Sequence, residues 1–158
     1  MDTIKVLFVC LGNICRSPSA EAIFQDKLNK RGIAYRYKVD SAGIINAHVG
    51  EKADSRMRKH AERRGYNITH RSRQFDPKKD FDEFDFIIGM DNRNISNLKS
   101  MTVNDEKLAK ISKMTDYCTT FQESEIPDPY YGGFEGFEYV LDLLEDACEG
   151  LLMKLEEV

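Results

Sequence analysis

The residues best suited to chemistry stand together near the N-terminus, in the octet Cys-Leu-Gly-Asn-Ile-Cys-Arg-Ser at positions 10–17. Cys10 and Arg16 bracket most of this segment, which follows an apolar run and precedes a helix-like pattern. If a strand ends at Val9 and a helix begins near Ser17, the intervening backbone N–H groups curl around a common centre, where the helix dipole adds positive potential. The spacing therefore predicts a loop that binds phosphate or another oxyanion.

Several residue types within this loop suit the chemistry of a phosphoryl group. A cysteine next to a helix N-terminus is favoured as the thiolate, so Cys10 is a candidate nucleophile. Arg16 offers a planar guanidinium that can hold two phosphoryl oxygens. Gly12 allows close backbone approach and Asn13 tolerates the left-handed conformation, so a tight curl is feasible. The other members of the predicted phosphate-binding loop are Leu11, Ile14, Cys15 and Ser17.

Other uses of two cysteines in one octet are packing, a disulfide or half of a metal site. Zinc sites usually pair cysteines at CxxC spacing with a second pair elsewhere, whereas Cys118 and Cys148 are isolated. The nucleotide-binding patterns GxxxxGK[ST] and GxGxxG are absent. The sequence favours a nucleophile loop that uses no metal.

The elements that must position this loop are predicted to alternate between strands and helices. The run from Ile4 to Cys10 is almost continuously apolar, as in a central parallel strand, whereas 35–40 alternates, as in a strand nearer an edge. An amphipathic helix with Pro18 in its first turn lies between them and stops at Gly32. The further elements expected are a helix at 54–64, a strand at 84–89, a helix starting near Asp91, a strand at about 108–114, and a C-terminal helix with an apolar stripe from Phe137 to Leu155.

This order is typical of a doubly wound α/β fold, with a four-stranded parallel sheet in flavodoxin-like order and helices on both faces. No repeat or linker interrupts the sequence, so residues 1–158 are expected to form a single domain. Ligands of such sheets bind beyond the carboxyl ends of the strands. Cys10, Ser41 and Asp91 all fall at such ends, and we expect them to form one composite site.

Asp128 is the candidate acid for this site. It follows the last predicted strand, and the prolines on either side restrict its backbone and could hold its carboxylate above the loop. A Pro-Asp-Pro stretch is also common in plain turns. Only the presence of the Cys10 loop makes the acid the preferred interpretation.

Composition narrows the class of protein. The chain has 158 residues, 41% of them hydrophobic and 32% charged, with a net charge of −4. It has no long apolar run and no leader-like N-terminus, and a free thiolate suits a reducing compartment, so a cytoplasmic protein without a membrane span is expected. Basic residues gather between Arg56 and Arg73. They could steer acidic substrates, although a solvated helix face is the simpler interpretation, and nucleic-acid binding is disfavoured.

These motifs resemble those of the low molecular weight protein tyrosine phosphatases. The octet, continued by Pro-Ser-Ala-Glu, is similar to that family's active-site signature, and Asp-Pro-Tyr-Tyr-Gly at 128–132 is similar to its acid loop. The similarity spans nearly the whole chain, because further resembling segments lie at 40–43, at 69–74, and at Met90 and Asp91 with Asn94.

The resemblance implies an enzyme, a metal-independent cysteine phosphatase that hydrolyses phosphotyrosine and small aryl phosphates. In that scheme Cys10 attacks phosphorus, Arg16 holds the oxygens, and Asp128 protonates the leaving phenolate and later accepts a proton from water. Ser17 would donate a hydrogen bond to the Cys10 sulfur. Tyrosine-phosphorylated proteins are the implied partners, and no cofactor is implied. The residues implied to support the loop are Asn13, Ser41, His70 and Asp91.

One departure from the family pattern concerns the mouth of the site. Many members carry Trp or Tyr in the loop after the Asp-Ser-Ala segment, but this chain has Ala47 at the aligned place, and we expect a wider mouth. Tyr130 and Tyr131 would then grip the substrate ring. Both tyrosines could also be phosphorylated, as the resemblance suggests, or serve only in loop packing.

Cys15 has two possible roles. It lies in the same loop as Cys10, so it could resolve an oxidised Cys10 sulfenic acid to a reversible disulfide, or it could be a small packed residue. Two further functions stay open. Arsenate reductases resemble this chain but relay oxidation through an additional pair of cysteines close in sequence, and a non-catalytic module would bind phospholigands without turnover.

Overall fold

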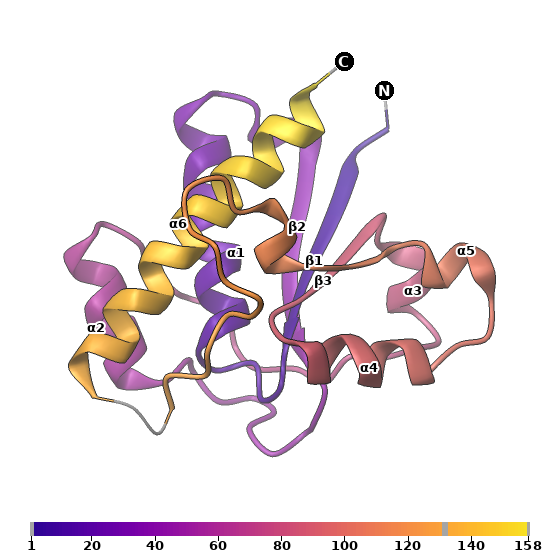
Figure 1. Ribbon diagram of the computed structural model, residues 1–158, viewed down its shortest axis with the longest axis horizontal. Helices are drawn as coiled ribbons and strands as arrows, with labels where there is room; N and C mark the ends of the chain where they lie inside the picture. Colours follow the sequence, from indigo (N-terminus) through magenta and orange to yellow (C-terminus); the bar gives the residue numbers. More distant parts are fainter. Residues whose placement is uncertain (1, 131–132, 158) are drawn as a thin grey trace.

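The computed structural model describes residues 2–130 and 133–157 and contains a four-stranded parallel sheet (Figure 1). Its order is β2-β1-β3-β4, which confirms the predicted doubly wound α/β fold with flavodoxin-like order. The longest strand pairing joins β1 to β2, from Ile4 opposite Tyr37 to Cys10 opposite Gly43. The strands are β1 (Ile4–Cys10), β2 (Tyr37–Gly43), β3 (Phe86–Gly89) and β4 (Ile111–Lys113).

Helices cover both faces of the sheet. Two 3-10 turns, η1 (Ala34–Arg36) and η2 (Met114–Tyr117), precede β2 and follow β4. In Figure 1, α1, α2 and α6 lie to the left of the strands and α3, α4 and α5 to the right, with both termini at the end opposite the loop after β1. The helices are α1 (Arg16–Lys30), α2 (Ser55–Arg63), α3 (Asp80–Glu83), α4 (Asn92–Ser100), α5 (Asp105–Leu108) and α6 (Phe134–Glu156).

Strand β1 lies at the centre of two hydrophobic cores. Successive residues of a strand point to opposite faces. Val6 and Phe8 therefore pack with α1 and α6, whereas Leu7 and Val9 pack with α3 and α4. All four side chains are fully buried, which explains the continuous apolar run that predicted a central strand. The loop after β1 thus starts from a strand that is paired on both sides and packed on both faces.

Strand β2 differs from the prediction at both ends, because Ala34–Arg36 form a 3-10 turn and the strand runs on to Gly43. A Cβ atom at Gly43 would lie 3.0 Å from the Leu11 carbonyl oxygen and 3.0 Å from the Gly12 carbonyl carbon. Glycine at this position lets the end of β2 lie directly against the loop. Strand β4 is also shorter than expected, since Asp105–Leu108 are helical.

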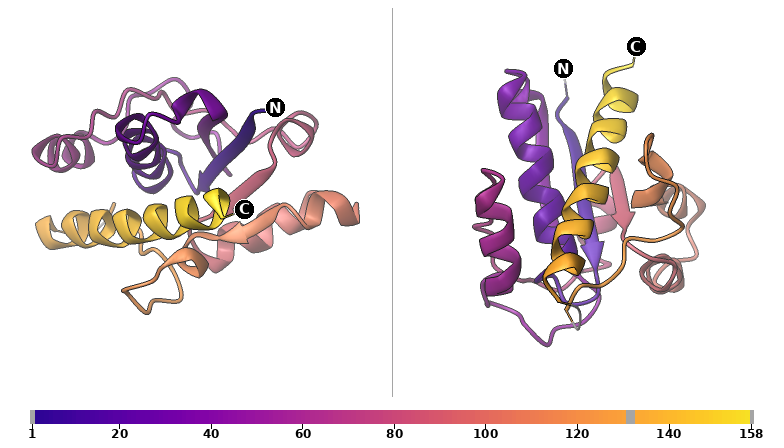
Figure 2. Two further views of the ribbon diagram at one scale, coloured as in Figure 1. Left: turned by 90° about the horizontal axis from the view of Figure 1, so that it is seen from above. Right: turned by 60° about the vertical axis from the view of Figure 1, so that its left-hand side comes forward.

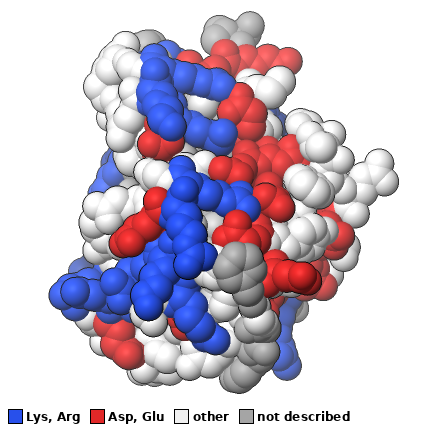
Figure 3. Space-filling view, turned by 90° about the vertical axis from the view of Figure 1, so that its left-hand side faces the viewer, with Lys and Arg blue, Asp and Glu red and all other residues white. Residues whose placement is uncertain are grey.

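Charged residues join α2 to α6. Arg64, at the end of α2, contacts Glu138, Asp142 and Glu145 of α6 at 2.6 to 2.9 Å. Figure 3 shows Lys and Arg gathered on one face beside a band of Asp and Glu. Part of the basic flank between Arg56 and Arg73 therefore serves packing. Among the described residues, no helix combines the length and apolarity that a membrane crossing requires.

Candidate active site

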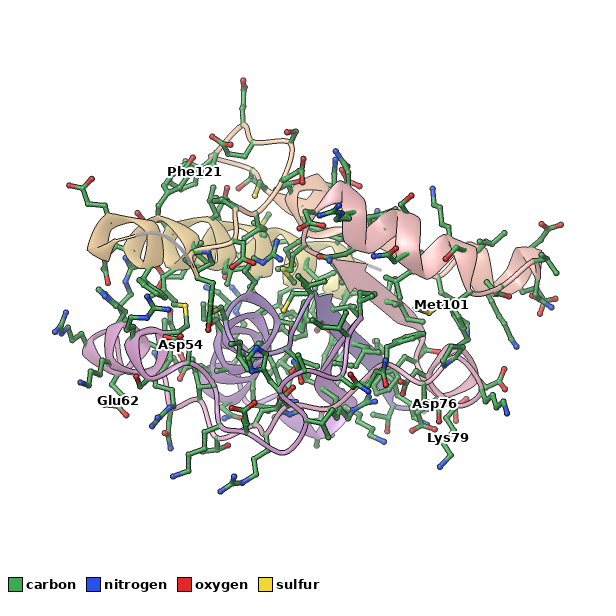
Figure 4. All side chains as sticks on the ribbon, turned by 90° about the horizontal axis from the view of Figure 1, so that it is seen from below. Asp54, Glu62, Asp76, Lys79, Met101 and Phe121 are labelled. Atoms are coloured by element: carbon green, nitrogen blue, oxygen red, sulfur yellow. The ribbon has the colours of Figure 1, made fainter. Side chains whose placement is uncertain are left out.

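The loop between β1 and α1 presents its backbone N–H groups to one side. The carbonyl oxygens of Cys10, Leu11 and Ile14 accept hydrogen bonds from the N–H groups of Ile44, Ile45 and Asp54, and that of Gly12 accepts one from the Ser72 hydroxyl. Within the described chain, no backbone N–H of residues 12–16 donates to a protein acceptor. Helix α1 has no side-chain cap and no acidic residue in its first turn. The loop is therefore suited to an anion. Figure 4 looks onto this end of the sheet, with Asp54 labelled at the start of α2.

Arg16 is a buried cation whose guanidinium still has a donor without an acceptor among the described residues. Its Nη1 donates to Asp91 Oδ2 at 2.7 Å and to the Ile126 carbonyl oxygen at 3.0 Å. Its Nε is buried and has no hydrogen-bond acceptor among the described residues. Burial opposes the charge, but Cys10 and Asp91 outweigh it and raise the pKa of Arg16. A permanently charged fork with a free Nε–H is therefore fixed in place for an oxyanion.

The Cys10 sulfur lies 3.0 Å from the Ser17 hydroxyl oxygen. That oxygen accepts a hydrogen bond from Asn13 Nδ2 at 2.7 Å, so the Ser17 hydrogen is free to point elsewhere. The Cys10 sulfur is nearer to it than the Ala42 carbonyl oxygen, which lies at 3.5 Å. Ser17 is therefore placed so that its hydroxyl can donate to the Cys10 sulfur.

Asn13 holds the loop in shape. Its φ of 58° is left-handed, the conformation that its residue type tolerates, and its side chain is buried. Nδ2 donates to Ser17 and also to Ser41 Oγ at 3.0 Å. Oδ1 accepts from the Arg73 backbone N–H at 3.0 Å and lies 2.8 Å from His70 Nε2. The structure thus brings together Ser41 and His70, which the resemblance implied. It adds Arg73, which lies in the resembling segment at 69–74 but was not among the expected site residues.

Behind this network lie two carboxylates that sequence reasoning did not place in the site. Ser41 Oγ donates to Glu21 Oε1 at 2.7 Å, and His70 Nδ1 lies 3.3 Å from Glu21 and 3.4 Å from Asp40. Burial raises the pKa of Glu21 to about 7, against the hydrogen bond from Ser41. Burial also lowers the pKa of His70, although Asp40 opposes that shift. Asp40 could have been suspected, because it directly precedes Ser41.

Asp128 lies at the rim of the site. Its Oδ2 is 3.7 Å from Arg16 Nη2, and its Oδ1 accepts the Tyr130 N–H at 3.0 Å. The loop that carries it is fastened at Ile126, whose carbonyl oxygen accepts from Arg16. One carboxylate oxygen therefore turns toward the cavity while the other is held by the backbone. Tyr131, expected to help grip the substrate, lies outside the described residues.

A cavity of about 190 Å³ opens above the loop and joins Cys10, Arg16 and Asp128. Its walls include Tyr130, as expected, but also Ile45 and His48. Ala47 was expected to form part of the substrate wall. In the structure it is exposed and does not line the cavity. Ile45 and His48 line the cavity instead, because β2 extends to Gly43 and the loop after it folds over Gly12. A Cβ atom added at Gly12 would lie 3.1 Å from Cδ2 of the His48 ring.

Comparisons with known proteins agree with this geometry. Residues 5–158 match the family model described as low molecular weight phosphotyrosine protein phosphatase. A putative low molecular weight protein-tyrosine-phosphatase of Synechocystis is 47% identical over 96% of both chains. The low molecular weight phosphotyrosine protein phosphatase of Saccharomyces cerevisiae is 44% identical over 86% of this chain and 85% of its own.

The fold is shared as well. The crystal structure of a protein tyrosine phosphatase from Entamoeba histolytica with Hepes in the active site has a TM-score of 0.95 and 49% identity, and the match covers 98% of each chain. Sequence and fold thus agree over almost the whole length. The chain belongs to the low molecular weight phosphotyrosine protein phosphatase family.

Proposed function

We propose that this chain is a protein tyrosine phosphatase that works through a cysteinyl-phosphate, with Cys10 as nucleophile, Arg16 as oxyanion holder and Asp128 as acid and base. The observation that carries the proposal is the buried Arg16 guanidinium, whose Nε has no acceptor among the described residues and which lines the same cavity as Cys10 and Asp128. A buried donor without an acceptor costs free energy. A bound phosphoryl oxygen would supply the missing acceptor.

In the first step the Cys10 thiolate attacks phosphorus, and a sulfur–phosphorus bond forms while the bond to the phenolic oxygen breaks. The N–H groups of the loop and Arg16 hold the phosphoryl oxygens throughout. Protonated Asp128 gives its proton to the departing phenolate, so tyrosine leaves as the neutral phenol. The position of Asp128 Oδ2 at the rim, 3.7 Å from Arg16, supports this role.

In the second step water attacks the cysteinyl-phosphate. The ionised Asp128 accepts a proton from that water, the sulfur–phosphorus bond breaks, and inorganic phosphate is released. Cys10 leaves as a thiolate, and the hydrogen bond from Ser17 stabilises the charge that develops on its sulfur. Asp128 thus acts once in its protonated form and once in its ionised form in each cycle.

The proposed substrates are tyrosine-phosphorylated proteins. A recessed loop reaches a phosphate on a long, rigid tyrosine more easily than one on serine, and Tyr130 and His48 offer ring faces at the mouth. Arg56 and Arg58 of α2 add positive charge near this mouth. We place the protein in the cytoplasm, where reducing conditions suit its four free cysteines.

The deciding experiment is rapid mixing of the full chain with an aryl phosphate. We expect a burst of phenol equal to the enzyme concentration, inhibition by vanadate, and no turnover by Cys10→Ser, which has no base to activate its hydroxyl. The matched control is Cys148→Ser, since the buried Cys148 does not line the cavity. Turnover by Cys10→Ser at the parent rate would refute the mechanism.

The two other functions give different results in the same assay. A binding module would take up phosphate without releasing phenol. An arsenate reductase would consume thiols in the presence of arsenate. The thiols of Cys118 and Cys148, however, donate hydrogen bonds to the carbonyl oxygens of Leu143 and Ala20, and neither residue lines the cavity. Apart from Cys10 and Cys15, no additional cysteine pair that could relay oxidation therefore lies beside the site in the described chain.

A further inference from the structure

Arg56 lies beside the active-site cavity without lining it, and the phosphatase chemistry gives it no direct role. It is the second residue of α2, and it is exposed. Its guanidinium nevertheless contacts three other parts of the site region: Asp54 before α2, Tyr130 beside the acid, and Phe137 in the first turn of α6. Holding a long exposed side chain in one place costs conformational entropy. The number of contacts therefore indicates a role beyond surface charge.

On one side, Arg56 forms a two-pronged ion pair with Asp54. Its Nε lies 3.1 Å from Oδ1 and its Nη2 lies 2.9 Å from Oδ2. Such a pair fixes the orientation of the guanidinium plane as well as its distance. Asp54 is itself held in place, because its carboxylate caps α2 and its backbone N–H donates to the Ile14 carbonyl oxygen at 2.9 Å. The guanidinium is thus fixed relative to the phosphate-binding loop.

On the other side, Arg56 holds the segment that carries Asp128. Its Nη2 donates to the Tyr130 carbonyl oxygen at 3.0 Å, and the Tyr130 backbone N–H donates to Asp128 Oδ1 at 3.0 Å. The guanidinium carbon also lies 5.4 Å from the ring centroid of Tyr130 and 4.9 Å from that of the buried Phe137. Two hydrogen bonds in succession therefore connect Arg56 to the carboxylate of the acid.

The segment around Asp128 has few backbone donors of its own with which to hold its shape. The residues directly before and after Asp128 are prolines, which have no backbone N–H. On the N-terminal side the segment is held at Ile126, whose carbonyl oxygen accepts a hydrogen bond from Arg16. On the C-terminal side it is held at Tyr130 by Arg56. Asp128 thus lies between two points that arginine side chains fasten to the rest of the site.

We propose that Arg56 is a positioning residue, which holds Asp128 above Cys10 by joining Tyr130 to the start of α2. The inference rests on the proposed role of Asp128 as the acid, and it adds a residue that this scheme did not contain. A lysine could not form the two parallel bonds and lie flat against the rings. The hydrogen bond from the start of α2 to the phosphate-binding loop is a backbone bond, so that loop does not depend on the Arg56 side chain.

The test is rapid mixing of the full chain with saturating substituted phenyl phosphates, with phenol release followed in the first turnover. For leaving groups of high pKa, Arg56→Gln is expected to slow release by about 10- to 100-fold, because misplacing a reacting group by about 1 Å can cost about 100-fold. The loss should shrink for leaving groups of low pKa, which depart without a proton. Inhibition by vanadate should equal that of the parent, which shows that the loop around Cys10 is intact.

Further variants separate positioning from charge. In the Asp128→Ala background, Arg56→Gln should cause no further loss, because a residue that acts through Asp128 then has no acid to position. Arg56→Lys keeps the charge without the planar fork, so it should be as slow as Arg56→Gln. The matched control is Lys59→Gln, which removes an exposed charge from the same helix. Lys59 makes no hydrogen bond or ion pair in the described chain, and its variant should release phenol at the parent rate.

The possible failures can be told apart. If Asp128→Ala loses the same factor for every leaving group, Asp128 is not the acid, and the role of Arg56 is refuted with it. If Asp128→Ala behaves as expected but Arg56→Gln keeps the parent rate, only the role of Arg56 is refuted. Full recovery in Arg56→Lys, or a further loss in the double variant, would show that Arg56 acts on the substrate by charge. Weaker vanadate inhibition with an equal loss across the series would show that it supports the loop. Either result would overturn the proposal.

Discussion

Asn13 shows how much of the site depends on a single side chain. Its amide makes four hydrogen bonds, two as donor to the hydroxyls of Ser17 and Ser41 and two as acceptor. These bonds hold the left-handed turn of the loop and keep the Ser17 hydroxyl oxygen 3.0 Å from the Cys10 sulfur. Aspartate at this position would offer no donor for either hydroxyl. The type of this residue therefore matters as much as its position.

Asp128 should affect the departure of the leaving group in the first step and the attack of water in the second. Asp128→Ala is expected to slow turnover of phosphotyrosine by roughly 10²- to 10⁴-fold, the usual contribution of a general acid. The loss should shrink for aryl phosphates with leaving groups of low pKa, because these depart without a proton. Rapid-mixing rates of phenol release in the first turnover, over a series of substituted phenyl phosphates, check this. A loss of the same size across the series in this first step would show that Asp128 is not the acid.

Cys15 should act only after oxidation. Burial, aided by Asp54, raises its pKa far above the ordinary value, so it stays a neutral thiol that does not compete with Cys10. After mild peroxide treatment, peptide mass spectrometry should find a Cys10–Cys15 disulfide, with activity restored by a thiol reductant. Cys15→Ser should lose this reversibility. If only sulfinic or sulfonic Cys10 is found in the parent, Cys15 is a packing residue.

Among the elements, α6 shows how one helix can use the same residue type in two ways. Gly150 lies against η2, where an added Cβ would fall 1.8 Å from the Tyr117 carbonyl oxygen. Gly136 lies in the first turn of the same helix, where an added Cβ would be 3.9 Å from Pro129 Cβ. The first glycine is required by close packing and the second is not.

Alanine at these two positions should therefore have opposite effects on the free energy of unfolding. Gly150→Ala is expected to destabilise the fold by about 1–3 kcal/mol or more, because backbone must move. Gly136→Ala should be neutral or stabilise by up to about 1 kcal/mol through helix propensity. Urea denaturation of both variants measures the difference. Equal stabilities would mean that η2 yields without cost.

Asp146 of α6 holds the segment that leads toward the acid loop. Its carboxylate accepts backbone N–H bonds from Thr119, Thr120 and Phe121 at 2.9 to 3.2 Å. Partial burial disfavours its charge, but these donors outweigh that effect and lower its pKa. A carboxylate whose pKa is lowered by folding contributes stability above its unfolded pKa, and this contribution is lost as the pH falls through its folded value.

Asp146→Asn should consequently lower the urea midpoint at pH 7, and the difference from the parent should narrow as the pH falls below about 4. The control is Asp2→Asn, which changes an exposed carboxylate before β1 that has no hydrogen bond or ion pair in the described chain. Its midpoint should follow that of the parent at every pH. A deficit of Asp146→Asn that is independent of pH would mean that its charge is not the stabilising feature.

For the whole molecule, the central position of β1 predicts a single cooperative unit. Both hydrophobic cores include residues of this strand. Helix α6 packs on α1, from the N-terminal part of the chain, and on η2, which follows the last strand. We expect residues 1–158 to unfold in one thermal transition, with calorimetric and van't Hoff enthalpies equal. Gly150→Ala should move that transition as a whole. Two separate transitions would refute a single domain.

The sequence alone predicted the chemistry that we propose for the loop and the order of the elements. Cys10, Arg16 and the apolar run before them are local signals, because a strand, a tight turn and a helix start depend mainly on neighbouring residues. The start of β1 was predicted to the residue, and the end of β1 and both ends of α2 to within one residue. Short elements such as α3, α5 and η2 were not predicted, since four residues are too few to show a period.

Tertiary structure alone decided which distant residues complete the site. The packing of β1, β2 and α1 brings together Glu21, Asp40 and Arg73 behind the loop. No local sequence pattern predicts contacts between residues so far apart in the chain. The wall of the cavity came from His48 and Ile45 instead of Ala47 for a similar reason. The direction of a loop side chain depends on where the preceding strand ends. Strand β2 can run on to Gly43 because glycine fits there against Leu11 and Gly12, which lie about thirty residues earlier in the chain.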